Sequence, residues 1–181
     1  MFMEIDFSKN WLLLFDDSIV SIDLPYDAMI HEKRYKECSN GEESAFFPGK
    51  KYIYRKEFSV DKKDNKYFAF RFEGVYRNAS VKLNGEVVGN NKYGFSEFVI
   101  DISDVVKEEN VLEVEVDNSL TPNARFYTGS GIYRPVYLIV KKEKEIENIK
   151  ISTVDYKNGV INVDIESQKG VNVKIFDNDQ I

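Results

Sequence analysis

Apolar residues recur at every second position in several short segments, and this period constrains the fold more than any other feature of the chain. In the clearest segment, three apolar residues alternate with Glu113, Glu115 and Asp117. Such alternation is typical of a β-strand that buries one face, because successive side chains point to opposite sides of a strand. A slip of one residue would turn the apolar set toward water. We expect six such side chains to lie buried between two sheets: Phe68, Phe70, Phe72, Leu112, Val114 and Val116.

The rest of the chain up to Val140 repeats this pattern of short strands separated by turns. Asn84-Gly85, for example, is a strong signal for a two-residue hairpin turn, because both residues tolerate positive φ. Thirteen Phe and eleven Tyr against three Met also favour strands over helices. At least eight strands are expected, enough for two packed antiparallel sheets. The sequence therefore predicts an all-β sandwich, with Trp11 in its core.

A change in composition after Val140 predicts a domain boundary. The charged run Lys141–Glu145 is typical of a solvated crossing, so we expect one domain at 1–142 and a second at 143–181. Three more strands are predicted, at 149–154, 160–165 and 171–176. Because an immunoglobulin-type sandwich needs about seven strands, the chain is expected to stop inside its second domain.

The second domain, 143–181, carries apolar residues for which the chain offers no obvious packing partner. Unpaired strand edges and an uncovered apolar face are unfavourable in water. We therefore expect this segment to pack against a second copy, giving a homodimer, or to fold back on the first sandwich. The residues concerned are Val160, Ile161, Val163, Ile165, Val171, Val173 and Ile175.

Composition excludes several classes of function. The net charge of -6 and the sequence pI of about 5.0 argue against nucleic-acid binding, which needs clustered Lys and Arg side chains. With Cys38 the only cysteine and His31 the only histidine, neither an intrachain disulfide nor a zinc site is expected, and no cofactor is indicated. The apolar runs are far shorter than the roughly 20 residues that span a bilayer, and Glu4 and Asp6 stand where a secretory signal would be basic or apolar, so neither a membrane span nor a secretory signal is expected. We expect a soluble, cytoplasmic protein that does not interact with membranes.

The most specific segment of the sequence is the run from Arg125 to Leu138, which joins an aromatic and cationic loop to a strand through Gly129-Ser130-Gly131. Glycines permit backbone angles closed to other residues, so the loop can fold tightly and still present Arg125 and Tyr127. Aromatic rings stack on the apolar faces of a pyranose, and a guanidinium donates paired hydrogen bonds. A carbohydrate site is one interpretation; the other is that the glycines turn a corner and the aromatic residues belong to the core.

Several blocks of the chain, in order, resemble the sugar-binding domain of family 2 glycoside hydrolases, the group of β-galactosidases, β-glucuronidases and β-mannosidases. The blocks cover most of residues 7–140. They include Phe7–Trp11, Leu24-Pro25-Tyr26-Asp27, Pro48-Gly49, Tyr54–Phe58, Val81–Gly85, Asp117-Asn118-Ser119 and Gly129–Arg134. The resemblance implies a jelly-roll, galactose-binding-like sandwich followed by an immunoglobulin-like sandwich and a catalytic (β/α)8 barrel. Two Glu residues of that barrel would act in a retaining mechanism.

The resemblance also implies roles for individual residues. Asp27, Arg125 and Tyr127 would bind sugar or face the barrel, although a turn role for Asp27 and simple packing for the other two remain open. Three further residues would be structural anchors of the loop: Gly129, Gly131 and Arg134. Arg134 would form an ion pair that holds the loop or the neighbouring domain. The chain also departs from the family pattern: Tyr26 replaces a common His, Ala28 a frequent Trp and Pro135 a frequent acidic residue.

These features predict a non-catalytic accessory domain of a β-galactosidase-like glycoside hydrolase, which shapes substrate entry and supports the barrel. No catalytic residue is expected in the chain, because glycoside cleavage needs a pair of carboxyl groups with tuned pKa values. Two alternatives stay open. One is a free-standing carbohydrate-binding module, and the other is a structural sandwich that mediates subunit contacts.

Overall fold

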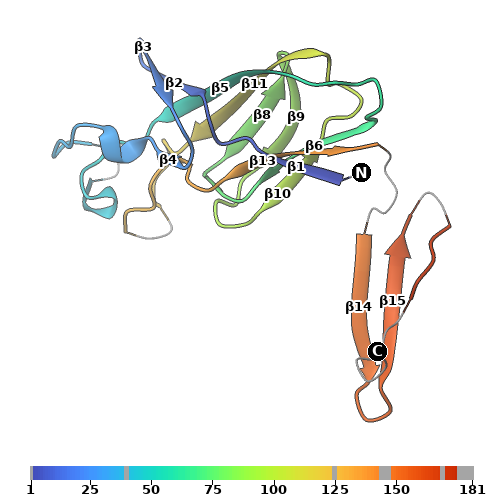
Figure 1. Cartoon of the computed structure of the whole chain (residues 1–181). Coiled ribbons are helices and arrows are strands. Elements are labelled where there is room, and N and C mark those ends of the chain that lie inside the picture. Colours follow the sequence, from blue (N-terminus) through green and yellow to red (C-terminus); the bar gives the residue numbers. More distant parts are fainter. Residues whose placement is uncertain (1, 39–40, 124–125, 143–147, 168–169, 175–181) are drawn as a thin grey trace. The chain divides into compact units, whose positions relative to one another are not determined.

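A computed structural model describes residues 2–38, 41–123, 126–142, 148–167 and 170–174. The chain divides into two compact units, Met1–Lys142 and Glu143–Ile181 (Figure 1). The structure is all-β, as the alternating pattern predicts, with two short 3-10 helices in the first unit, η1 (Met29–His31) and η2 (Gly41–Ser44). No helix in the described ranges is long and apolar enough to cross a membrane.

Two antiparallel sheets form the sandwich of the first unit (Figure 1). The larger sheet contains, in spatial order, β3 (Ser18–Ile22), β2 (Trp11–Phe15), β5 (Lys51–Ser59), β11 (Glu109–Asp117), β8 (Ala79–Leu83) and β9 (Glu86–Asn91). The smaller sheet contains β1 (Phe2–Asp6), β13 (Val136–Lys141), β6 (Tyr67–Phe72) and β10 (Phe98–Asp101). Strands far apart in sequence are neighbours in both sheets, so most of the pairing is long-range.

The core lies between these sheets, and the prediction for its six central side chains is confirmed. Three of them come from β6 and three from β11, and none is more than 1% exposed. Phe58 of β5 meets Phe70 of β6 across the core, with ring centroids 5.7 Å apart. Trp11 is fully buried, and its indole N–H donates to the Phe7 carbonyl oxygen at 2.7 Å. The predicted hairpin at Asn84-Gly85 is also present, with φ of 53° and 86°.

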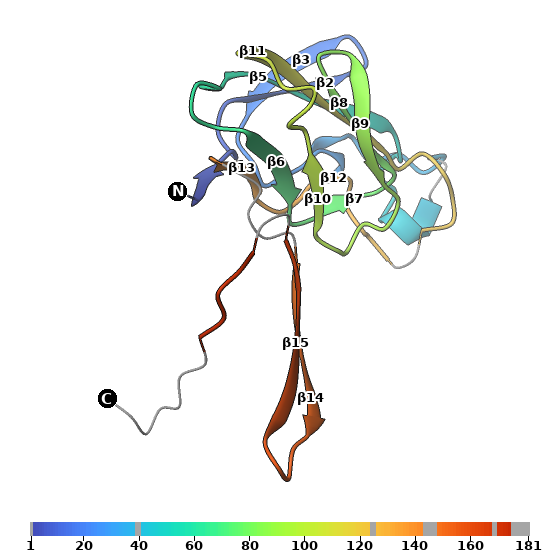
Figure 2. The same cartoon turned by 90° about the vertical axis from the view of Figure 1, so that its right-hand side faces the viewer.

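A third, smaller sheet determines where the candidate site lies. It joins β4 (Tyr26–Asp27), β12 (Gly131–Ile132) and β7 (Val75–Tyr76), with β12 in the middle. Figure 2 shows β12 beside β7. Its register places Asp27 opposite Gly131 and Gly131 opposite Tyr76. Three segments separated by about 50 residues each therefore meet in one row.

The second unit contains an antiparallel hairpin of β14 (Asn148–Asp155) and β15 (Val160–Glu166). The third strand predicted at 171–176 is wrong for residues 171–174, which form no strand, and the last two positions lie outside the described residues. Val171 and Val173 do alternate with polar residues, but alternation makes a strand only where a neighbour pairs with its backbone. The immunoglobulin-like identity of this unit stays a prediction.

Candidate functional site: a clasped loop

The carboxylate of Asp27 connects two segments that are 100 residues apart. Its Oδ1 accepts hydrogen bonds from the backbone N–H groups of Met29 at 3.0 Å and Ser130 at 2.9 Å. Its Oδ2 accepts the hydroxyl hydrogen of Tyr127, with an oxygen–oxygen distance of 2.8 Å. We call Asp27, Tyr127 and Ser130 the clasp. Because hydrogen bonds to an ionised acceptor are the stronger kind, the clasp fixes the loop before β12 against β4.

Further contacts hold the same loop from other sides. The side-chain amide of Asn118 donates to the Gly129 carbonyl oxygen at 3.0 Å. The Tyr127 N–H donates to the Glu43 carbonyl oxygen at 2.8 Å, which connects the loop to η2. The Ala28 N–H donates to the Ser130 carbonyl oxygen, also at 2.8 Å. The described part of the loop is therefore held by its own backbone as well as by side chains.

Both glycines of the Gly-Ser-Gly turn are required by close contacts. Gly129 has a φ of +71°, and a Cβ there would lie 2.7 Å from Oδ2 of Asp27. Gly131 has a φ of +142°, and its Cβ would lie 2.0 Å from the Tyr54 hydroxyl oxygen and 2.6 Å from the Tyr26 carbonyl oxygen. Those two oxygens are themselves hydrogen-bonded at 2.9 Å. The tight turn thus lets a buried tyrosine reach the backbone of β4.

The electrostatics of the clasp favour a neutral tyrosine. Burial, together with the hydrogen bond to Asp27 and its negative charge, raises the pKa of Tyr127 well above the ordinary tyrosine value. Burial likewise raises the pKa of Tyr54, and the charge of Asp27 adds to that shift. Tyr127 therefore stays protonated and donates to Asp27 at neutral pH. With three donors already on its oxygens, Asp27 has the contacts of a positioning group, and direct sugar contact by it stays a prediction.

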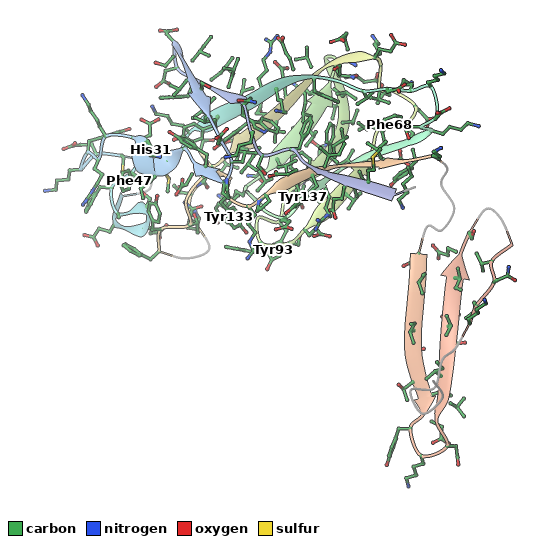
Figure 3. The ribbon with its side chains drawn as sticks, in the orientation of Figure 1. His31, Phe47, Phe68, Tyr93, Tyr133 and Tyr137 are labelled. Atoms are coloured by element: carbon green, nitrogen blue, oxygen red, sulfur yellow. The ribbon has the colours of Figure 1, made fainter. Side chains whose placement is uncertain are left out.

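The Tyr127 ring packs among aromatic and cationic side chains beside the clasp. It packs against Phe47 with centroids 5.6 Å apart, and the Arg34 guanidinium lies 5.6 Å from the Phe47 centroid. Figure 3 shows Phe47 and His31 on the same side of the sandwich. His31 is exposed, and its ring stacks on Tyr26 with the centroids 4.7 Å apart. Aromatic and cationic side chains thus gather where the clasped loop meets the segment after β4.

Arg125 lies outside the described residues, so its predicted role as a sugar or barrel contact has no structural account. Arg134 is exposed, and its guanidinium lies 5.6 Å from the centroid of Tyr133. It forms no ion pair with any described residue, so the expected ion pair that holds the loop is not found in the sandwich. Pro135, which follows Arg134, offers no charge for such a pair. An anchor to a neighbouring domain stays a prediction.

The sequence did not indicate Asn118 and Tyr54 as parts of this site. Both lie inside segments that resemble the family, yet nothing in their spacing shows that they reach Gly129 and the backbone of β4. The exposed Tyr93 and Phe95 were also missed, because isolated aromatic residues in a turn carry no period. In the described part of the chain, no group of three or more His, Cys, Asp or Glu side chains is placed to hold a metal ion.

Comparisons with known proteins assign this architecture. Residues 17–157 match the family described as the glycosyl hydrolase 2 galactose-binding domain-like family. The β-galactosidase BoGH2A of Bacteroides ovatus is 36% identical over 177 residues, a match that covers 87% of this chain and 21% of that enzyme. The chain thus spans about a fifth of the length of this curated relative.

Solved structures agree with this assignment. A β-glycosidase from Bacteroides vulgatus superposes with a TM-score of 0.78 at 31% identity, covering 92% of this chain and 24% of that one. A glycosyl hydrolase family 2 member from Bacteroides cellulosilyticus gives a TM-score of 0.72 at 29% identity, covering 84% and 22%. The sandwich, the Gly-Ser-Gly turn and these matches together show that the chain belongs to glycosyl hydrolase family 2, through the galactose-binding-like domain of that family.

Proposed function

We propose that this chain acts as a non-catalytic, carbohydrate-binding accessory unit of a β-galactosidase-like glycoside hydrolase. Its clasped loop forms one wall of the sugar site at the mouth of the catalytic barrel, and the sandwich supports that barrel. The observation that carries the proposal is the clasp, in which Asp27 accepts hydrogen bonds from both Tyr127 and Ser130. A loop held by this many hydrogen bonds is preorganised, which suits a surface that binds a ligand.

The chemistry of the clasp supports positioning rather than catalysis. A retaining glycosidase needs two carboxyl groups about 5 Å apart, one of them able to give up and regain a proton. Asp27 uses both oxygens to hold the loop, so it is poorly suited to that cycle. We infer that the two catalytic carboxylates belong to a separate barrel of the same polypeptide and that the reaction is hydrolysis of a β-glycoside.

The gene sequence beyond the codon of Ile181 tests this proposal. We expect the reading frame to continue for on the order of 250 or more codons that encode a barrel with two catalytic Glu residues. A stop codon directly after Ile181 would contradict an accessory role within one polypeptide. The purified 181-residue chain should also fail to release p-nitrophenol from p-nitrophenyl β-D-galactopyranoside.

Calorimetry separates the accessory unit from a free-standing binding module. Pockets gain affinity by burying most of a ligand, whereas a single wall buries only part of it. We therefore expect galactose, glucuronic acid and mannose each to bind the chain with a dissociation constant above about 1 mM. A sub-millimolar value for any of the three would favour the free-standing module.

A further inference from the structure

A second feature near the clasp is a pair of exposed aromatic rings in the turn between β9 and β10. The side chain of Tyr93 is 64% exposed and that of Phe95 is 44% exposed. Their ring centroids lie 5.8 Å apart with an interplanar angle of 71°, so the two rings form a corner. We call Tyr93 and Phe95 the aromatic corner.

The backbone that carries the aromatic corner is held in place. The Asn91 side chain accepts from the Tyr93 N–H at 3.2 Å and donates to the Tyr93 carbonyl oxygen at 3.0 Å. The Tyr133 hydroxyl donates to the Gly94 carbonyl oxygen at 2.7 Å. A Cβ at Gly94 would lie 2.2 Å from the Tyr76 ring, so the turn lies directly on that ring. A turn fixed in this way can bind a ligand without first losing conformational entropy.

The aromatic corner lies on the same small sheet as the clasp. Tyr76 of β7 contacts Phe95 at 5.2 Å between centroids, and its hydroxyl donates to Oδ1 of Asn123 at 3.4 Å. Tyr76 is opposite Gly131, which in turn is opposite Asp27. Two strand spacings therefore separate the backbones of Tyr76 and Asp27, about 10 Å. Figure 3 shows Tyr93 near Tyr133 at the lower edge of the sandwich.

The size of the exposed surface favours a small ligand over a protein partner. Two half-exposed rings offer roughly 200 Å², whereas a stable protein interface buries about 800 Å² on each side. The charged side chains of Lys92 and Glu97 flank the corner and limit its apolar area. Aromatic faces suit the apolar face of a pyranose ring, and in the described part of the chain the Asn123 amide nitrogen has no hydrogen-bond acceptor.

We propose that Tyr93 and Phe95 form a stacking platform for a pyranose unit of a neutral, galactose-containing oligosaccharide. This inference rests on the proposed carbohydrate role of the domain and adds a contact surface to it. One sugar unit stacks in the aromatic corner, and the next extends past Asn123 toward the clasp. The backbone of Tyr76, whose ring contacts Phe95, lies about 10 Å from the backbone of Asp27, a span of roughly two pyranose units.

Nuclear magnetic resonance of the 15N-labelled 181-residue chain tests the platform. A β-linked galactose tetrasaccharide is titrated to about 50 mM, and amide shifts are followed along the chain. We expect saturable shifts in residues 91–96 with millimolar affinity. Tyr93→Ala should weaken binding about threefold to tenfold. Tyr156→Ala removes a tyrosine that is 80% exposed in the hairpin unit and should leave the affinity unchanged.

Phe95→Leu keeps an apolar side chain and removes the ring, so it separates stacking from simple apolar contact. Weaker binding in this variant, with an unchanged amide spectrum elsewhere, supports the platform. The inference is overturned if residues 91–96 show no saturable shift, or if Tyr93→Ala binds as tightly as the native chain. Shifts confined to residues 118–131 would also overturn it, yet leave the accessory role intact, because the gene sequence tests that role independently.

Discussion

Strand β11 of the sandwich and strand β14 of the hairpin have the same alternating sequence pattern and opposite burial. Leu112, Val114 and Val116 are fully buried, whereas Ile149 and Ile151 are 53% and 67% exposed. In β14 and β15 the apolar residues again share one face, because Ile149 is opposite Ile165 and Ile151 is opposite Val163. The other face carries polar pairs such as Lys150 and Asp164.

The difference shows what a period of two determines and what it leaves open. Alternation fixes which side chains share a face, and the register then aligns them across strands. Burial also requires a second layer, which the four-stranded sheet supplies for β11 within the first unit. Isolated two-stranded hairpins are marginally stable in water, so an uncovered apolar face contributes little to stability.

Truncating one leucine or isoleucine in each region gives the largest expected contrast. Leu112→Ala should lower the free energy of unfolding of the sandwich by about 3 kcal/mol, because it removes buried methyl groups and leaves a cavity. Ile151→Ala should change the same quantity by less than about 0.5 kcal/mol. Urea unfolding followed by Trp11 fluorescence measures both. Equal losses would mean that the hairpin face is covered in solution.

Removing an aspartate that binds backbone N–H groups gives the next contrast. Asp27→Ala leaves the N–H of buried Ser130 without an acceptor and should destabilise the sandwich by about 2 kcal/mol. Asp155, the last residue of β14, accepts from the Lys157 and Asn158 N–H groups of the hairpin turn. Because water can replace it there, Asp155→Ala should leave the sandwich transition unchanged. A similar result for both variants would rule out a special role for the clasp.

Alkaline pH should weaken the sandwich through its buried tyrosines. Burial raises the pKa of Tyr52, Tyr54 and Tyr127 above the unfolded value of about 10. The unfolded chain therefore loses these protons first, and the stability they support is complete below about pH 10 and falls as pH rises above it. The urea midpoint should decline between about pH 9.5 and 11, less steeply in Tyr127→Phe. A flat profile would contradict the burial of these hydroxyls.

Self-association through the hairpin face is the smallest effect we expect. The face measures about 20 Å by 10 Å, roughly 200 Å² per copy, well below the about 800 Å² per partner of a stable interface. We propose a weak homodimer with a dissociation constant above about 100 μM, which Ile151→Lys should abolish. Sedimentation equilibrium across that range checks it, and monomeric behaviour of the native chain at the highest concentration would exclude the dimer.

Sequence alone predicted the local features of this fold better than its long-range contacts. The buried set in β6 and β11, the core position of Trp11 and the Asn84-Gly85 turn all follow from period or turn chemistry within a few residues. The hydrogen bonds of the clasp could not be predicted from the sequence, because Asp27 and Tyr127 meet only through the register of the small sheet. At Val171 and Val173 the local pattern was misleading: their alternation predicted a strand, but residues 171–174 form none, because no neighbour pairs with their backbone.

Steady-state hydrolysis by the full-length gene product tests most directly whether the clasped loop forms part of the sugar site. The native full-length protein is compared with Tyr127→Phe and with Tyr156→Phe at a temperature where all three remain folded, using the p-nitrophenyl β-glycoside that gives the highest rate of the proposed hydrolysis. Loss of the Tyr127 hydroxyl removes the hydrogen bond to Oδ2 of Asp27 while the Ser130 N–H keeps its bond to Oδ1, so the Tyr127 end of the proposed wall loosens. We predict that kcat/KM falls about tenfold in Tyr127→Phe and stays unchanged in Tyr156→Phe. Equal kcat/KM for all three proteins would contradict a role for the clasped loop in the sugar site.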